Sequence, residues 1–177
     1  GATVGKLAGP DGAQPGGVGS WAERAEPWTV GALAVVNALG DVRGASGAIL
    51  AGARTPAGTW LDGSAAARRS SPAGGFPAPP PAGTNTTLAV VATDAPLTRT
   101  ALQHLARAAS VALARRIAPV HTPFDGDVTF ALSTATDARE QPPAELLRLG
   151  ETAAFALEQA IERAVLHTGS GPAGAGA

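Results

Sequence analysis

An abrupt change at residue 85 most constrains how this chain can fold. Residues 62–84 are rich in Pro, Ala, Ser and Gly, with Pro-Ala-Pro-Pro-Pro at 77–81. Proline donates no ladder hydrogen bond and small residues bury little apolar surface, so this segment is predicted to be an exposed loop. Residues 86–92 are instead a continuous β-branched and apolar run. That run predicts a strand buried on both faces.

Further elements are predicted on both sides of this junction, from apolar periodicity and from turn and cap residues. Together they indicate an α/β layered domain. The predicted elements are strands at 28–37 and 47–53 with a turn at 40–44, a helix from the N-cap Thr98 to Pro119, a strand at 127–134, a helix from Pro142-Pro143 to Gly169, and a disordered tail at 170–177.

Composition argues against several classes of function. The 177 residues fit one domain, and a net charge of -1 gives no basic face for nucleic acid or an anionic membrane. No apolar run is long enough to span a bilayer. The sequence has no cysteine, which removes disulfides and thiol chemistry, and its three histidines are far apart in sequence. We therefore expect no metal and no cofactor, and a cytoplasmic location is compatible with the lack of disulfides.

The junction itself carries residues suited to chemistry. Thr86 directly follows Asn85 at the start of the predicted strand. A threonine hydroxyl is a weak nucleophile unless a base takes its proton. If the Asn85–Thr86 bond breaks, the new α-amine, with an unperturbed pKa of roughly 7.7–8.0, can act as that base. The same residues are also typical of a turn ahead of a strand, and the pattern alone favours that plainer interpretation.

Four blocks in order along the chain resemble the L-aminopeptidase/D-esterase family of self-processing hydrolases, which includes β-aminopeptidases. They are Gly-Ala-Thr-Val-Gly-Lys at 1–6, residues 30–42, residues 86–97, and Asp-Gly-Asp at 125–127 with Phe-Ala-Leu-Ser-Thr at 130–134.

The resemblance implies an αββα sandwich of the N-terminal-nucleophile type, with helix layers outside two stacked sheets. It also implies scission between Asn85 and Thr86. Residues 1–85 would then be the C-terminal part of a large subunit and residues 86–177 the small subunit. An oligomer is implied as well, often a tetramer of such heterodimers. The threonine at the junction looks most like the pantetheine hydrolase of carbapenem biosynthesis, since many relatives have serine there.

Three further site residues follow from the resemblance. Asn37 ends a predicted strand, and its amide is implied to stabilise the oxyanion, although the pattern alone favours an Asn bonded to its own turn. Asp125 and Asp127 are implied to bind the Thr86 amine or accept its proton, and a solvated turn is the alternative. Relatives usually have Ser-Gly-Glu where this chain has Asp-Gly-Asp, so the carboxylate is shorter and a hydroxyl is absent.

These observations predict an amidohydrolase that acts on a small amide or peptide, such as a β-aminopeptide or a pantetheine-like substrate, through an acyl-enzyme at Thr86. Two alternatives stay open: an acyltransferase of the ornithine acetyltransferase type, and a non-catalytic fragment. The second arises because the sequence has no Met and family members carry a long segment before the Gly-Ala-Thr-Val-Gly-Lys block. We therefore expect an upstream segment with part of the substrate pocket to be missing.

Overall fold

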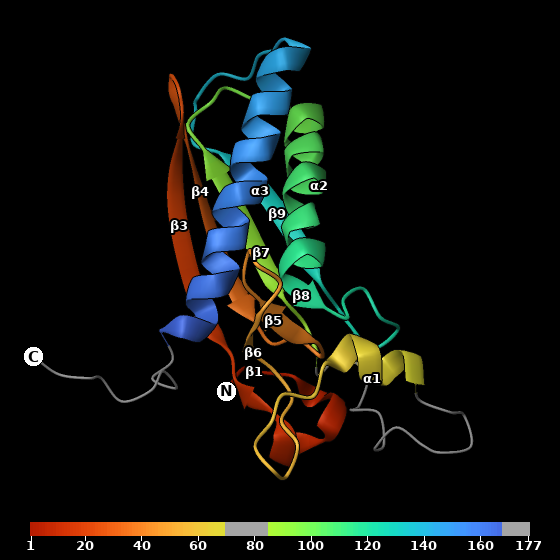
Figure 1. Cartoon of the computed structure of the whole chain (residues 1–177). Coiled ribbons are helices and arrows are strands. Elements are labelled where there is room, and N and C mark those ends of the chain that lie inside the picture. Colours follow the sequence, from red (N-terminus) through yellow and green to blue (C-terminus); the bar gives the residue numbers. More distant parts are fainter. Residues whose placement is uncertain (70–84, 168–177) are drawn as a thin grey trace, which may run out of the picture.

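The structure, a computed structural model, describes residues 1–69 and 85–167. Its helices and strands follow one another in an α/β order (Figure 1). They are β1 (Thr3–Val4), η1 (Lys6–Ala8), η2 (Pro10–Gly12), β2 (Gln14–Pro15), β3 (Gly17–Ala25), β4 (Trp28–Val36), β5 (Asp41–Arg43), β6 (Ile49–Ala51), α1 (Gly63–Arg69), β7 (Leu88–Thr93), α2 (Arg99–Arg116), β8 (Ile117–Ala118), β9 (Val128–Ser133) and α3 (Pro143–Leu166).

A four-stranded sheet in the order β3-β4-β7-β9 forms the centre of the molecule. Strand β4 runs antiparallel to both β3 and β7, whereas β7 and β9 are parallel. A parallel pair needs a crossover connection, and α2 provides it between β7 and β9. Helices α2 and α3 lie side by side across one face of this sheet (Figure 1).

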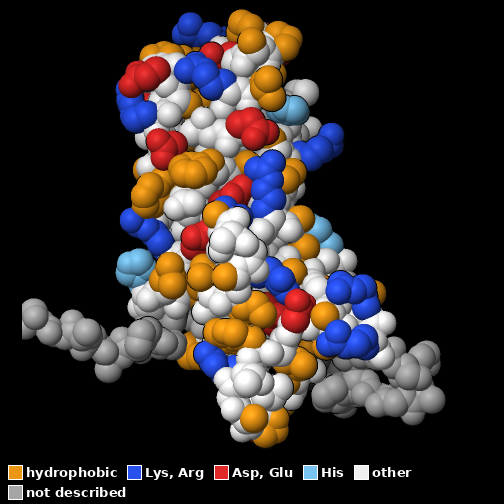
Figure 2. All heavy atoms as spheres, viewed as in Figure 1, with side chains coloured by type: hydrophobic (Ala, Val, Ile, Leu, Met, Phe, Trp, Pro, Cys, Tyr) orange, Lys and Arg blue, Asp and Glu red, His pale blue; other side chains and the backbone are white. Residues whose placement is uncertain are grey.

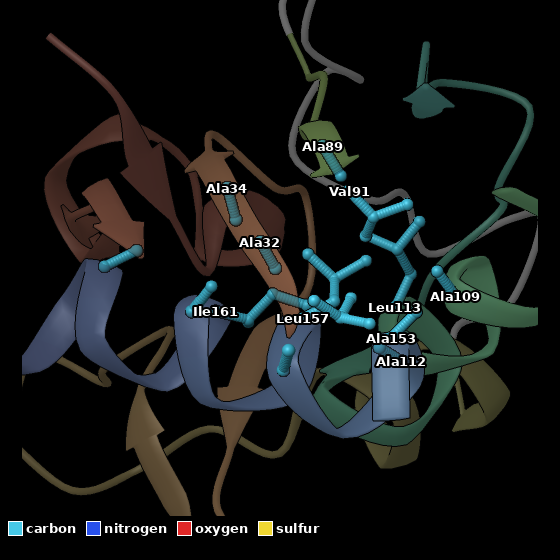
Figure 3. Close-up of a cluster of buried hydrophobic side chains, with 14 of the residues drawn as sticks. Ala32, Ala34, Ala89, Val91, Ala109, Ala112, Leu113, Ala153, Leu157 and Ile161 are labelled. Carbon is cyan, nitrogen blue, oxygen red and sulfur yellow. The ribbon is translucent and has the colours of Figure 1, made fainter. Parts of the chain in front are cut away.

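The core lies between that sheet face and the two helices. Every second side chain of β4 and β7 points into it, among them Ala34 and Val91, where they meet Leu113 and Leu157 (Figure 3). All four are at most 1% exposed. Small side chains let the layers approach closely: a Cβ on Gly19 of β3 would lie 2.0 Å from the Ala160 carbonyl oxygen of α3.

The opposite face of the sheet carries exposed apolar side chains. Phe130 is 58% exposed and Leu88 is 45% exposed. Leu33 of β4 and Val18 of β3 share this face, because the pleat sends alternate side chains to opposite sides. The prediction that residues 86–92 are buried on both faces is therefore wrong for the described chain, in which one face of β7 is covered.

A smaller sheet, β6-β5-β8, gathers with β1, β2 and α1 at one end of the molecule (Figure 1). Asp41 fixes this region, since its buried carboxylate accepts hydrogen bonds from the amides of Ala53 (2.9 Å) and Gly63 (2.8 Å). Two predictions fail here. Residues 41–43 form a strand rather than a turn, because they pair with β6 and β8, and residues 63–69 form a helix within the predicted loop.

The other predicted elements are largely confirmed. Thr98 caps α2 by accepting a hydrogen bond from the Ala101 amide, Pro143 begins α3, and the strands at 28–36 and 128–133 occur as expected. The α/β class is confirmed. Strand β3 was not predicted. The proline-rich stretch 70–84 and the tail 170–177 lie outside the described residues.

Charges of both signs are interspersed over the face formed by the two long helices (Figure 2). Arg115 and Arg116 of α2 pair there with Glu158 of α3, and Arg116 also pairs with Glu162. Among the described residues, none of the helices has the length and apolar character needed to cross a membrane.

Candidate active site

Sheet register brings three of the predicted site segments together. Val35 of β4 pairs with Leu88 of β7, and Leu88 pairs with Val128 of β9. Counting two residues beyond these pairs places Asn37, Thr86 and Gly126 in one row at the end of the sheet. The small sheet and α1 gather at this same end (Figure 1). We call the residues around this row, including Lys6, Asn85, His121, Asp125 and Asp127, the strand-end cluster.

The peptide between Asn85 and Thr86 is held at both ends by main-chain hydrogen bonds. The Gly126 amide donates to the Asn85 carbonyl oxygen at 2.8 Å, and the Thr86 amide donates to the Asn37 carbonyl oxygen at 2.9 Å. An N–H group aimed at a carbonyl oxygen stabilises the negative charge that develops there during nucleophilic attack. The bond predicted to break is therefore fixed and polarised.

The hydroxyl of Thr86 lies against Gly126. A Cβ built on Gly126 would be 2.8 Å from Thr86 Oγ1, so any larger side chain at position 126 would push on the hydroxyl. The steric fit against Thr86 thus explains why the residue between the two aspartates is a glycine. The role of Gly126 was not predicted from the sequence.

The two aspartates of the cluster have different surroundings. Asp127 accepts a hydrogen bond from the Thr87 amide at 2.7 Å, and its side chain is 4% exposed. Burial raises the pKa of Asp127, and the charge of Asp125 raises it further. The carboxylate of Asp125 instead accepts the Thr122 amide at 2.8 Å. Asp127 is thus a buried carboxylate at the start of the strand, with a pKa raised by its surroundings.

His121 joins the cluster from the loop before β9. Its backbone is left-handed, with φ of 54°, and its Nδ1 lies 4.0 Å from Asp127 Oδ2. The ring is 56% exposed. A protonated His121 favours the ionised form of Asp127, and it lowers the pKa of that carboxyl against the larger effect of burial.

Asn37 contacts the N-terminal segment through its side chain. Its Oδ1 accepts hydrogen bonds from Lys6 Nζ at 2.8 Å and from the Thr3 amide at 3.1 Å. Lys6 was not predicted as a site residue. The signal that could have found it is its place in the Gly-Ala-Thr-Val-Gly-Lys block, where it is the only lysine of the sequence.

Asn85 is fully buried, with its Nδ2 3.4 Å from the Phe124 carbonyl oxygen. Its Oδ1 has no hydrogen-bond partner in the described part of the chain. A buried acceptor without a partner costs about 1–3 kcal/mol, so the uncut junction carries an energetic cost. No group of three or more His, Asp or Glu side chains able to hold a metal ion occurs within residues 1–69 and 85–167.

Comparison with known proteins adds a second kind of observation. The model of peptidase family S58 matches residues 11–175. An uncharacterized aminopeptidase of Mycobacterium tuberculosis is 39% identical over 175 residues, which cover 88% of this chain and 49% of that protein. The chain thus spans about half the length of the curated relatives it matches.

Solved structures agree on the fold. A Burkholderia sp. β-aminopeptidase superposes with a TM-score of 0.51 at 25% identity, over 84% of this chain and 41% of that one. The L-aminopeptidase D-Ala-esterase/amidase of Ochrobactrum anthropi, described as a variant of the Ntn hydrolase fold, gives a TM-score of 0.56 at 23% identity, over 84% and 39% of the two chains. The predicted fold class is therefore confirmed.

Proposed function

The chain belongs to peptidase family S58, and from this premise we propose that it is a self-cleaving amide hydrolase whose nucleophile is Thr86. The observation that carries the proposal is the clamped Asn85–Thr86 peptide. Its carbonyl oxygen accepts the Gly126 amide and its nitrogen donates to Asn37. Both hydrogen bonds act on the bond that must break.

Self-cleavage begins when Thr86 Oγ1 attacks the Asn85 carbonyl carbon. The C–N bond to Thr86 then breaks, and its nitrogen takes a proton to become a free α-amine. Water hydrolyses the resulting ester, which leaves an Asn85 carboxylate and restores the Thr86 hydroxyl. Asp127 is the group we assign to accept and return the proton, because it is a buried carboxyl of the cluster and burial raises its pKa.

The buried Asn85 side chain adds a driving force for scission. Its Oδ1 lacks a partner while the junction is intact. Once the bond is cut, Asn85 becomes a chain end that can leave this site and regain water. Relief of that cost favours the cleaved form.

Turnover uses the same atoms on a second amide. The α-amine of Thr86 serves as the base for its own hydroxyl, and the substrate acyl group forms an ester on Oγ1 before water releases it. The Gly126 amide, with the Asn37 carboxamide as a second donor, stabilises the oxyanion. Acid, base and nucleophile therefore all come from the strand-end cluster.

The substrate class that we propose is a small amide or peptide, such as a β-aminopeptide or a pantetheine-like molecule. Threonine rather than serine at the junction supports the pantetheine-like choice. We further propose that residues 1–85 and 86–177 end up in separate subunits that stay together, and that these heterodimers assemble into a larger oligomer, often a tetramer in the family that the sequence resembles.

The test is the fate of the junction in the full-length protein. Thr86→Ala should leave one uncut polypeptide, whereas wild type should yield a fragment whose N-terminus is Thr86, as read by intact-mass spectrometry. Thr87→Ala is the matched control, because it changes the neighbouring threonine but keeps the main-chain bond to Asp127. Two fragments from the Thr86→Ala protein would refute the assignment. An amine acceptor added to the wild-type assay separates hydrolysis from acyl transfer by its products.

A further inference from the structure

Lys6 lies in the strand-end cluster, although the reaction outlined above gives it no part. Its Nζ donates to Asn37 Oδ1 at 2.8 Å and to the Asn37 carbonyl oxygen at 3.2 Å. We propose that Lys6 is a positioning residue, which fixes the carboxamide of Asn37 and places a positive charge beside the nitrogen of Thr86. This inference rests on the proposed function.

Donors from the N-terminal segment bind the oxygen of the Asn37 side chain. Its Oδ1 accepts both Lys6 Nζ and the Thr3 amide. A carboxamide has its acceptor and its donors on opposite sides, so holding the oxygen here turns the Nδ2 donors away from Lys6. A flipped amide would set N–H groups against two donors and lose both hydrogen bonds. Without Lys6, the proposed oxyanion donor loses one of the hydrogen bonds that hold its side chain.

The charge of Lys6 acts on the nitrogen that scission releases. The Thr86 nitrogen and Lys6 Nζ both bind the Asn37 carbonyl oxygen, at 2.9 and 3.2 Å. Two nitrogens on one oxygen at these distances are at most about 6 Å apart, close enough for a strong charge interaction. After scission this nitrogen is the α-amine, and a nearby positive charge keeps it neutral, and so basic, at lower pH.

Other charged groups belong to the same cluster. Asp125 raises the pKa of the Lys6 ammonium, although burial lowers it by more. Asp127 and His121 are the remaining titratable groups of the cluster. Loss of the Lys6 charge would raise the pKa of the Thr86 α-amine. The amine would then stay protonated to higher pH, which moves the onset of activity to higher pH.

The backbone fixes Lys6 in place. Its amide donates to the Leu39 carbonyl oxygen at 2.9 Å, and the Gly5 amide donates to that of Gly40 at 2.9 Å. Gly5 has φ of 68°, and a Cβ there would be 2.0 Å from the Ala53 nitrogen. Only glycine fits this turn without strain, and the turn delivers the lysine to Asn37. Such support by a second layer of contacts is what precise sites require.

The experiment compares Lys6→Met, Lys6→Arg and Arg24→Met in the full-length protein. Arg24 is the control, because it is a paired surface cation near the Ala25–Trp28 end of the sheet, opposite the cluster. The measurements are the rate of scission after Asn85 by intact mass, and the pH profiles of kcat and kcat/KM on a small chromogenic amide.

We expect Lys6→Met to slow scission and kcat by roughly tenfold or more, since misplacing one reacting group has effects of this size, and to change KM little. The acid limb of kcat/KM should move up by roughly 0.5–2 pH units, as expected for a charge about 6 Å away at an effective dielectric constant between those of water and a protein surface. Lys6→Arg should keep the limb in place while recovering part of the rate. Arg24→Met should match wild type.

A Lys6→Met profile that superimposes on wild type would overturn the proposal. If that variant does not fold, Lys6→Arg decides: a wild-type rate with a displaced limb contradicts the assigned roles. Failure of the proposed function looks different, because the wild-type chain would then remain uncut, or Thr86→Ala would still be cleaved, whatever stands at position 6.

Discussion

The helix-covered core and the strand-end cluster are built on the same strands, β4, β7 and β9, but they bury opposite kinds of group. In the core, Ala34, Val91 and Leu157 are completely covered and bring no polar atom with them. In the cluster, Asn85 buries an oxygen without a partner, and Asp127 is a carboxylate whose pKa is raised by burial. Burial stabilises the first region and costs energy in the second.

The difference shows how one sheet serves both ends. Core packing fixes the register of β4 against β7, with Val35 opposite Leu88. That register then holds Asn37 against Thr86 two residues further on, at 2.9 Å. The stability that the core provides therefore offsets the energetic cost of the cluster. Substitutions in the core should lower stability and leave the chemistry intact, whereas substitutions in the cluster should impair the chemistry with little loss of stability.

The largest effect is expected from Asp127→Asn. General acid–base catalysis contributes about 10²–10⁴-fold, and Asp127 is the group assigned to the proton transfer of self-cleavage, so scission should slow by that order. Because burial raises the pKa of Asp127, the wild-type rate of scission should fall as the pH drops through this raised value, and this acid limb of the scission rate should be lost in the variant. Rates followed by intact mass across pH test this. A retained limb would assign the proton transfer to another group.

The same substitution should not destabilise the fold. A carboxyl whose pKa is raised on folding favours the folded state most when it is protonated. That contribution is lost as the pH rises through the folded pKa. An asparagine avoids this loss and still offers Oδ1 to the Thr87 amide. Near neutral pH, Asp127→Asn should therefore unfold at an equal or higher denaturant concentration than wild type. A clear loss of stability would contradict the conclusion that burying the Asp127 carboxylate costs free energy.

Leu157→Ala should show the reverse pattern. Leu157 is completely buried on α3, so a cavity there costs about 2–5 kcal/mol in the free energy of unfolding. Leu147 lies on the same helix and is 64% exposed, and its substitution by Ala is the matched control, with a change within about 0.5 kcal/mol. Denaturant titration measures both. Scission in the folded fraction should proceed normally, and slowed scission would mean that core and cluster are coupled.

Gly126→Ala should damage chemistry with little loss of stability. The added methyl would be 2.8 Å from Thr86 Oγ1, so the hydroxyl must move. Misplacing a reacting group by about 1 Å can slow a reaction by roughly 10²-fold. Gly31→Ala on β4 is the control, since its nearest neighbouring atom is 4.0 Å away. Intact mass and thermal unfolding should separate the two variants, and scission in Gly126→Ala at the wild-type rate would remove the steric argument.

The sequence could predict much of the fold, because local signals decide those elements. Thr98 caps its helix and Pro143 opens the other, as expected from the side-chain hydrogen bond and the fixed φ of proline. Strand β3 was missed because it contains glycines and charged residues such as Glu23. Long-range pairing with β4 and contact with α3 overrode its weak propensity.

The candidate site was predictable in its residues but not in its contacts. Thr86 stood out because it lies at the junction, and Asn37 because it ends a predicted strand. Asp127 stood out because it forms a carboxylate pair with Asp125. Their contacts depend on register between strands about 50 residues apart in sequence, which periodicity does not reveal. Gly126 contributes its main-chain amide, and a sequence pattern does not reveal a main-chain contact. Lys6 was missed because its partner Asn37 is 31 residues away.

The smallest effect is expected on the uncovered face of the sheet. Phe130 is 58% exposed there, so Phe130→Ser in a chain of residues 1–177 should change the free energy of unfolding by no more than about 0.5 kcal/mol. The same change should reduce self-association in sedimentation, because exposed apolar patches promote it. Val91→Ser, on the covered face of the same sheet, should cost several times more. Equal costs at the two positions would mean that something also packs on the outer face, and the contrast between a covered and an open face would no longer hold.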